Sequence, residues 1–129
     1  MDCMGEQLAH QGFTELEVWK QARIFKNEIW SLTKSFPSEE KFRLVDQLVR
    51  ASRSVGSNIA EGHGRFTYKE QLHFCILARG SLSEIYNHLV DALDCEYINA
   101  EKFKSVEAGY KRVEKLLNGY VTFLRKSVK

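Results

Sequence analysis

The chain has 129 residues, of which 43% are hydrophobic and 28% are charged, and its formal net charge is +2. A chain of this length forms about one domain that can bury a core without disulfides or metal, and its composition excludes a disordered polypeptide. Its apolar runs fall far short of the roughly 20 residues of a membrane span, and the N-terminus lacks the features of a secretory signal. The three cysteines have no C-x-x-C spacing, which indicates reduced thiols. We therefore expect a cytoplasmic protein with no cofactor and no membrane contact.

A first helix is predicted after residues 1–12, which show no clear period and are expected to form a flexible N-terminal tail. Thr14 and Glu17 fit a capping box at the start of this helix, and Pro37 ends it. One apolar stripe consists of Val18, Ala22, Phe25, Ile29, Leu32 and Phe36. Two tryptophans border this stripe, and basic or amide residues lie mostly off it: Trp19 and Trp30, then Lys20, Arg23, Lys26, Asn27 and Lys34.

A second helix is predicted from Ser38, as its N-cap, to Gly62, where Gly62-His63-Gly64 ends it through a left-handed cap. Three rows run along this helix. The apolar row contains Val45, Leu48, Ser52, Val55 and Ile59; the small or amide-bearing row contains Gln47, Ala51, Ser54 and Asn58; and the remaining face contains Arg43, Asp46, Arg50, Arg53, Ser57 and Glu61. Small side chains allow another helix to come close.

Two longer helices complete the domain, which is expected to span 13–129. Thr67 and Glu70 form a capping box for the third helix, which runs to about Leu93, and Asn99 caps the fourth. The pair Gly80-Ser81 in the third helix predicts close approach of a neighbouring backbone. The fourth helix has a buried stripe containing Val106, Tyr110, Val113, Leu117, Tyr120 and Leu124, and the opposite side carries Lys104, Lys111, Lys115 and Lys126.

Four helices joined by short links predict an all-α fold, an up-down-up-down antiparallel four-helix bundle. The apolar and small-residue surface of these helices exceeds what one copy can bury, so we expect a homo-oligomer. No specific catalytic constellation is present: the histidines do not form H-E-x-x-H, no Cys/His set has zinc spacing, and the helical serines are typical of packing. We therefore expect no enzymatic activity. The segment Gly62–Arg65 fits a helix cap and turn better than a phosphate-binding loop.

Two features leave alternatives open. Asn58 should be partly buried and therefore needs hydrogen-bond partners. It either bonds to a side chain of the third helix, such as Ser81, Ser83 or Glu84, or recognises a ligand. The basic rows of the second and fourth helices are either solvated faces or phosphate contacts, which a ring of subunits would multiply into a strong local field.

Several segments together resemble the four-helix-bundle proteins encoded in intervening sequences of bacterial large-subunit ribosomal RNA genes: residues 16–19, 36–37, 47–51, 57–62, Arg65 and 78–84. That family is related to the accessory proteins of diversity-generating retroelements, which work with a reverse transcriptase and nucleic acid. The resemblance implies an up-down bundle that assembles into a homopentameric ring. By family position it marks Arg50, Asn58, Glu61 and Arg65 for testing. This sequence departs from the family's pattern at two places. Arg53 stands where a small residue is common, and residues 94–97 replace the usual Leu-Gly-Tyr connection.

Two functions remain open from the sequence. The first is a non-enzymatic oligomer that contacts RNA, DNA or a reverse-transcriptase-type enzyme through its basic rows. The second is a structural or scaffolding oligomer that binds a protein partner without contacting nucleic acid. The candidate contact residues are Arg43, Arg50, Arg53, Asn58, Glu61, Arg65, Lys104, Lys111, Lys115 and Lys126.

Overall fold

Four α helices account for most of the computed structural model, which describes residues 12–128. They are α1 (Glu17–Thr33), α2 (Leu44–His63), α3 (Tyr68–Asp94) and α4 (Ala100–Ser127). Two short 3₁₀ turns, η2 (Phe13–Glu15) and η3 (Ser38–Glu40), precede α1 and α2, and no strand occurs between residues 12 and 128. The predicted all-α class is confirmed. Apart from Gly12, the tail predicted at 1–12 lies outside the described residues.

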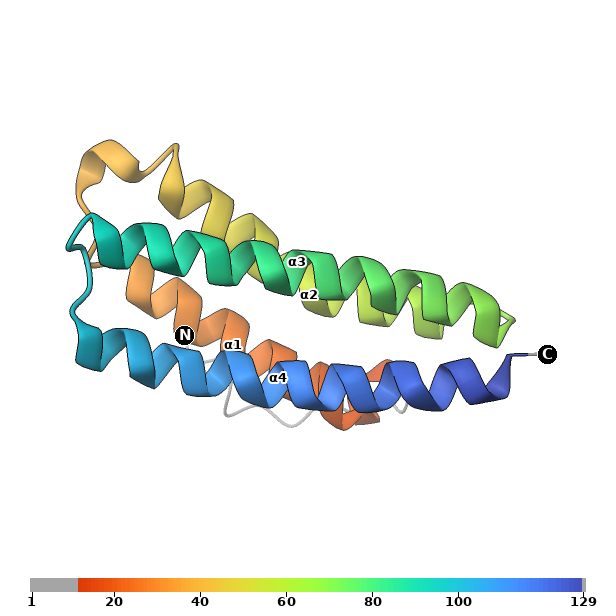
Figure 1. Ribbon diagram of the computed structural model, residues 1–129. Coiled ribbons are helices and arrows are strands. Elements are labelled where there is room, and N and C mark those ends of the chain that lie inside the picture. Colours follow the sequence, from red (N-terminus) through yellow and green to blue (C-terminus); the bar gives the residue numbers. More distant parts are fainter. Residues whose placement is uncertain (1–11, 129) are drawn as a thin grey trace.

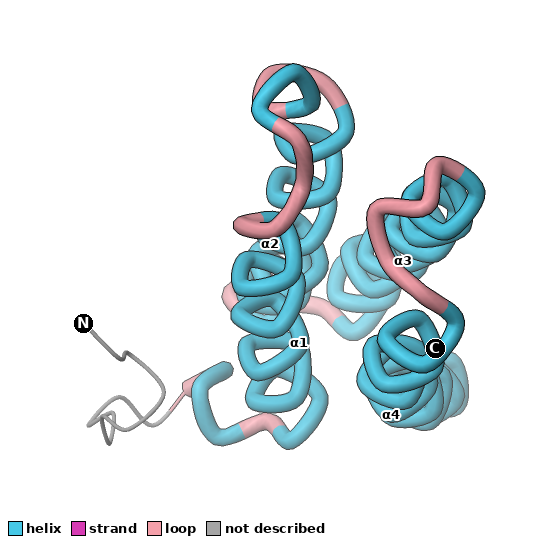
Figure 2. Tube along the Cα trace, turned by 90° about the vertical axis from the view of Figure 1, so that its left-hand side faces the viewer, coloured by secondary structure: helices cyan, strands magenta, loops and turns pink. Residues whose placement is uncertain are grey.

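The helices form the predicted bundle, because each runs opposite to the one before it (Figure 1). The packed pairs are α1 with α2, α2 with α3, α3 with α4, and α4 with α1. Figure 2, viewed along the bundle, shows α1 and α2 on one side and α3 and α4 on the other. Consequently α2 and α4, which carry the predicted basic rows, lie diagonally across the bundle. Across the described residues, no helix is long and apolar enough to cross a membrane.

The core lies where the apolar stripes converge. Its largest fully buried side chains include Phe25 and Ile29 of α1, Leu48 and Ile59 of α2, Ile85 and Leu89 of α3, and Leu117 and Leu124 of α4. Burial of these side chains supplies the main driving force for the fold. Cys75 of α3 is also buried, and burial raises the pKa of its thiol to about 11.

The predicted caps of α3 and α4 are present. The backbone N–H of Glu70 donates to the Thr67 hydroxyl at 3.1 Å, and the Thr67 hydroxyl donates to the Glu70 carboxylate at 3.2 Å, which completes the capping box. The Asn99 side-chain oxygen accepts from the N–H of Lys102 at 2.7 Å.

The predicted bounds of the first helix are wrong at both ends. Thr14 is buried in the 3₁₀ turn η2, and Leu16 takes the N-cap position of α1 with no side-chain cap. The helix ends at Thr33, three residues before Phe36. Phe36 still joins the core, because the chain turns and places its ring 5.5 Å from that of Tyr97. Tertiary packing of this ring therefore outweighs continuation of the helix.

The second helix begins later than predicted, at Leu44, because its buried stripe begins there. Leu44 and Leu48 are buried, whereas Glu40 and Lys41 would occupy the same stripe one turn earlier. A helical extension through these charged residues gains no apolar burial, and Ser38 makes no side-chain cap. Instead, the Tyr97 hydroxyl donates to Glu40 at 2.7 Å, which ties the α1–α2 connection to the α3–α4 turn; this hydrogen bond raises the pKa of Tyr97 to about 12.

The glycines at the α2–α3 turn also differ from prediction. Gly64 takes the C-cap position with φ −78°, an ordinary right-handed conformation, so the predicted left-handed cap is wrong. Gly62 instead allows close packing: a Cβ there would lie 2.8 Å from the Phe74 Cβ and 3.2 Å from the Gln71 carbonyl oxygen. The prediction that another backbone comes close at Gly80-Ser81 is wrong for Gly80. Apart from its own helix backbone, nothing lies within 4 Å of the position that a Cβ would occupy there.

The α3–α4 turn places Glu96 in the left-handed region, with φ 62°. The N–H of Tyr97 donates to the Ala92 carbonyl at 2.9 Å, and the N–H of Glu96 donates to the Leu93 carbonyl at 3.0 Å. These two bonds form a Schellman motif with Glu96 at the position that favours glycine. The fold therefore carries a local backbone strain at this turn.

Glu96→Gly is expected to raise the free energy of unfolding by about 1 kcal/mol, because glycine adopts a positive φ without a Cβ penalty. Urea denaturation of both chains measures the change. Glu96→Ala removes the same carboxylate but keeps a Cβ, so it should leave stability nearly unchanged. Equal stabilisation by both substitutions would mean that removal of charge, rather than relief of strain, is responsible.

Candidate functional site

Two of the predicted contact residues at α2 line grooves, and these grooves are different. Arg50 lines the groove between α2 and α3, whereas Arg53 lines the groove between α1 and α2. Arg43 is exposed and takes the N-cap position ahead of α2, outside both grooves. The basic residues predicted to form one row on this helix therefore do not lie on one common surface.

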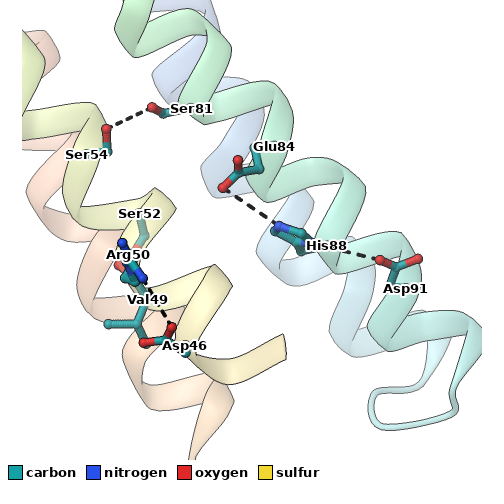
Figure 3. Close-up of polar contacts among 9 residues, drawn as sticks. All are labelled: Asp46, Val49, Arg50, Ser52, Ser54, Ser81, Glu84, His88 and Asp91. Carbon is teal, nitrogen blue, oxygen red and sulfur yellow. Dashed lines mark hydrogen bonds and ion pairs between the residues drawn. The ribbon is translucent and has the colours of Figure 1, made fainter. Parts of the chain in front are cut away.

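The α2–α3 groove is lined by residues of both charges, Arg50 of α2 and Glu84 of α3, together with Ser54 and Ser81 (Figure 3). Arg50 pairs with Asp46 on its own helix at 3.5 Å. Nε2 of His88 lies 3.7 Å from Glu84, and its Nδ1, which lies 3.8 Å from Asp91, is buried without a hydrogen-bond partner among residues 12–128. Cationic and anionic groups largely balance here, so this groove offers little net attraction to an anion.

The Asn58 side chain forms hydrogen bonds within its own helix, α2. Its side-chain N–H₂ donates to the Ser54 carbonyl at 2.9 Å and to the Ser54 hydroxyl at 3.0 Å. The Ser54 hydroxyl in turn hydrogen-bonds to that of Ser81 on α3 at 2.9 Å (Figure 3). The direct bond predicted from Asn58 to α3 is therefore wrong, because Ser54 stands between them. This chain of bonds supports the structural interpretation of Asn58.

Glu61 and Arg65 are paired with each other at the end of α2. Their side chains form an ion pair at 3.2 Å, and the Arg65 guanidinium lies 4.8 Å from the centre of the Phe74 ring. Because this guanidinium already has an anionic and an aromatic neighbour, only a ligand that replaces them could engage it.

The row of lysines on α4 lies on an exposed outer face of the bundle. Lys111 pairs with Glu107 at 3.8 Å, and nearby Arg112 reaches across to Glu28 of α1 at 3.7 Å. Burial raises the pKa of the Glu28 carboxyl, and the charge of Arg112 opposes that rise. Lys104, Lys115 and Lys126 make no ion pair within residues 12–128. None of these three lysines lines the α1–α2 groove or the α2–α3 groove.

The α1–α2 groove has a different character, because its lining contains cations and no carboxylate. Two adjoining hollows of about 200 and 270 Å³ share Lys26, Ser52 and Arg53. Arg23 completes the cationic lining, while Ala22 and Gly56 contribute to a floor of small residues. Lys26 and Arg53 make no ion pair with any residue of the described part of the chain. Their charges are therefore available to an anionic ligand.

A tryptophan lines each of the two hollows. Trp30 is 47% exposed, and both Lys34 Nζ and Arg53 Cζ lie over its ring, at 5.6 and 6.0 Å from the centre. Trp19 packs across α2, where its Nε1 lies 3.5 Å from the position of a Cβ on Gly56. Lysine and arginine attract phosphate, and an exposed indole offers a stacking surface for a flat base. The groove can thus hold a phosphate-bearing aromatic ligand.

Sequence reasoning includes Arg53 but misses the residues that α1 contributes. The missed signal is a spacing of four, three, four and four residues, which puts one basic and aromatic row on a single face of α1: Trp19, Arg23, Lys26, Trp30 and Lys34. The apolar stripe of the same helix places both tryptophans at its border instead. Separating these two interpretations requires knowing which face α2 covers.

Comparisons with known proteins bear on the family and on the fold. A family model described as 23S rRNA-intervening sequence protein matches residues 14–119. A crystal structure described as a protein with unknown function from the S23 ribosomal protein family of Bacteroides thetaiotaomicron matches with a TM-score of 0.75 and 24% identity, covering 81% of this chain and 95% of that one. At that identity the likeness establishes the fold alone. No curated protein matches the chain at a significant level.

Proposed function

We propose, from the premise that this chain belongs to the 23S rRNA-intervening sequence protein family, that it is a non-enzymatic homo-oligomer that binds nucleic acid. The observation that carries the proposal is the α1–α2 groove, where Lys26 and Arg53 are free of ion pairs with residues 12–128 and no carboxylate lines the walls. Phosphate contacts supply most of the affinity in sequence-independent nucleic-acid binding. Belonging to a family encoded within ribosomal RNA genes does not make the chain a ribosome component.

The local distribution of charge supports nucleic-acid binding at the α1–α2 groove more strongly than the net charge of the chain does. A net charge of +2 gives little attraction over the whole molecule. In contrast, Arg50, Arg65 and Lys111 each have a carboxylate partner within 4 Å, whereas Lys26 and Arg53, which line one groove from two adjacent helices, have none among residues 12–128. Local concentration of unpaired charge is what attracts a polyanion at physiological salt.

The non-enzymatic part of the proposal is supported by Ser52 and Ser54, which have structural partners. The Ser52 hydroxyl donates to the Val49 carbonyl at 2.9 Å and is buried, and Ser54 bonds to Ser81 (Figure 3). A nucleophilic serine needs an adjacent base instead.

The oligomeric part is supported by exposed apolar side chains on one end of the bundle. Phe66 is fully exposed, and Tyr68 packs edge-on against the exposed Phe123 with ring centres 6.2 Å apart. Ile76 and Leu77 of α3 are also nearly half exposed. Burial of such surface against other copies would stabilise an oligomer and would repeat the groove around it, in the ring of five that the resemblance implies.

Replacing Lys26 and Arg53 by alanine should weaken binding of a labelled oligonucleotide about tenfold and reduce the slope of log affinity against log salt by about 1–2. Fluorescence anisotropy between about 50 and 200 mM salt measures both quantities. The matched control is Lys104→Ala with Lys115→Ala, which removes the same charge from α4. If both double variants weaken binding equally, attraction is diffuse and the groove is not the interface.

Assembly is tested separately by light scattering of the full chain. A particle several times the 15.0 kDa chain mass supports the oligomer, and a folded monomer at working concentration contradicts it.

The exposed aromatic side chains also favour a second function, a scaffold for a protein partner. Phe66, Tyr68 and Phe123 resemble the aromatic anchors that dominate protein interfaces. In that case affinity capture should recover one defined partner whether or not nuclease is present, and the oligonucleotide should not bind.

A further inference from the structure

Resting on the proposed function, we infer that the α1–α2 groove takes single-stranded nucleic acid and that Trp30 is its base-stacking platform. The exposure of Trp30, the cations around it and the length of the groove support this assignment.

Trp30 has an accessible aromatic surface inside a cationic frame. Its side chain is 47% exposed although it lies on a helix that packs against two others. The Lys34 ammonium and the Arg53 guanidinium approach its ring from α1 and α2, and Lys26 lies one turn away. Because Lys34 Nζ and Arg53 Cζ lie over the ring, a base that stacks on this indole would displace one or both from its face. Its phosphates would then be within reach of these two side chains and of Lys26. Stacking on an aromatic ring beside basic side chains is the usual mode of single-strand recognition.

The floor of the groove allows a flat group to come close to the backbone. Ser52 lines both hollows, and Ala22 and Gly56 line the one nearer Trp19. Trp19 and Trp30 are eleven residues apart on one helix, so the groove between them is about 16 Å long. That length accommodates a strand of a few nucleotides.

A duplex is much wider than the about 8–10 Å that separates the axes of two packed helices, so it would lie across the groove rather than along its lining residues. A duplex could touch the cations on the rim, but its bases remain stacked on one another and cannot reach Trp30. A single strand gains both the phosphate contacts and the stacking contact, and so it should bind more tightly.

The test compares an unstructured labelled oligonucleotide with a hairpin of matched length and composition, as RNA and as DNA, on the full-length chain. We expect the single strand to bind at least tenfold more tightly and to quench tryptophan fluorescence. Trp30→Leu should weaken single-strand binding about 5- to 100-fold and leave hairpin binding unchanged, whereas Trp30→Phe should retain most of the affinity.

The matched control is Phe42→Leu. Phe42 is another exposed aromatic side chain, with Lys41 Nζ 5.4 Å from its ring centre, but it lies outside the groove. Circular dichroism establishes that each variant is folded. Equal binding of strand and hairpin, unaffected by Trp30→Leu but weakened by loss of Lys26 and Arg53, would overturn this inference and leave the proposed function standing. Absence of binding to either ligand would overturn both, and equal losses for Trp30→Leu and Phe42→Leu would overturn the assignment to the groove.

Discussion

Leu89→Ala is expected to lower the free energy of unfolding by about 2–5 kcal/mol, the range typical of a buried leucine replaced by alanine. Leu89 lies on α3 and has no exposed surface. The substitution removes apolar burial and leaves a cavity between helices that can relax only partly, because their spacing is set by many other contacts. Urea denaturation followed by circular dichroism measures the change.

Leu77→Ala is the matched control, because it makes the same chemical change on the same helix at a side chain that is 44% exposed. Its effect on unfolding of a single copy should stay within about 0.5 kcal/mol. If Leu77 lies between copies, the substitution weakens assembly instead, which light scattering detects. Comparable destabilisation by the two variants, with assembly unchanged, would contradict the position of the core described above.

Gly62→Ala is expected to destabilise the fold by about 1–3 kcal/mol, although alanine is the better helix former. The added methyl group would meet the Phe74 Cβ at 2.8 Å and the Gln71 carbonyl oxygen at 3.2 Å. These atoms belong to or adjoin the backbone of α3, so relief requires the two helices to separate. Thermal denaturation of the variant measures the loss.

Gly80→Ala is the control for that substitution. Apart from the backbone of its own helix, nothing lies within 4 Å of its Cβ position, so alanine there should stabilise the helix by about 0.5–1 kcal/mol through propensity alone. The two glycine variants should therefore shift the melting temperature in opposite directions. A rise in both would show that α2 and α3 tolerate a larger separation than their packing indicates.

Most of the helical architecture is predictable because its determinants are local. The stripe from Val18 to Leu32 has a helical period, and all five of its members within α1 are buried. Thr67 and Asn99 cap their helices through hydrogen bonds to residues three positions further on. Such signals depend only on a few neighbouring residues.

The wrong boundaries have tertiary causes. Ser38 has the chemistry of a cap, but the helix starts at Leu44, where the buried stripe starts. The connection of 94–97 departs from the Leu-Gly-Tyr pattern of the resembling family, yet the chain still makes the turn, with Glu96 in the left-handed conformation. Helix packing and closure of the turn determine these segments more than the local cap residues do.

The candidate groove is only partly predictable for a similar reason. Arg53 can be identified from its own helix, but the groove also requires Lys26 and Trp30 of α1, and their approach depends on how α1 and α2 pack. A single helical row can indicate a basic and aromatic face, but it does not reveal which neighbouring row completes it.

The two cysteines within residues 12–128 differ in exposure, so their reaction with a thiol reagent can measure transient opening of the bundle. Cys75 is buried on α3 and its thiol has a pKa of about 11, whereas Cys95 is exposed at the end of that helix. A thiol reagent modifies Cys95 directly, but it modifies Cys75 only when α3 separates from its neighbours and the thiol ionises. The ratio of the two labelling rates therefore reports how often the bundle opens, without an engineered label, and it can be read in the free chain and with a ligand in the groove.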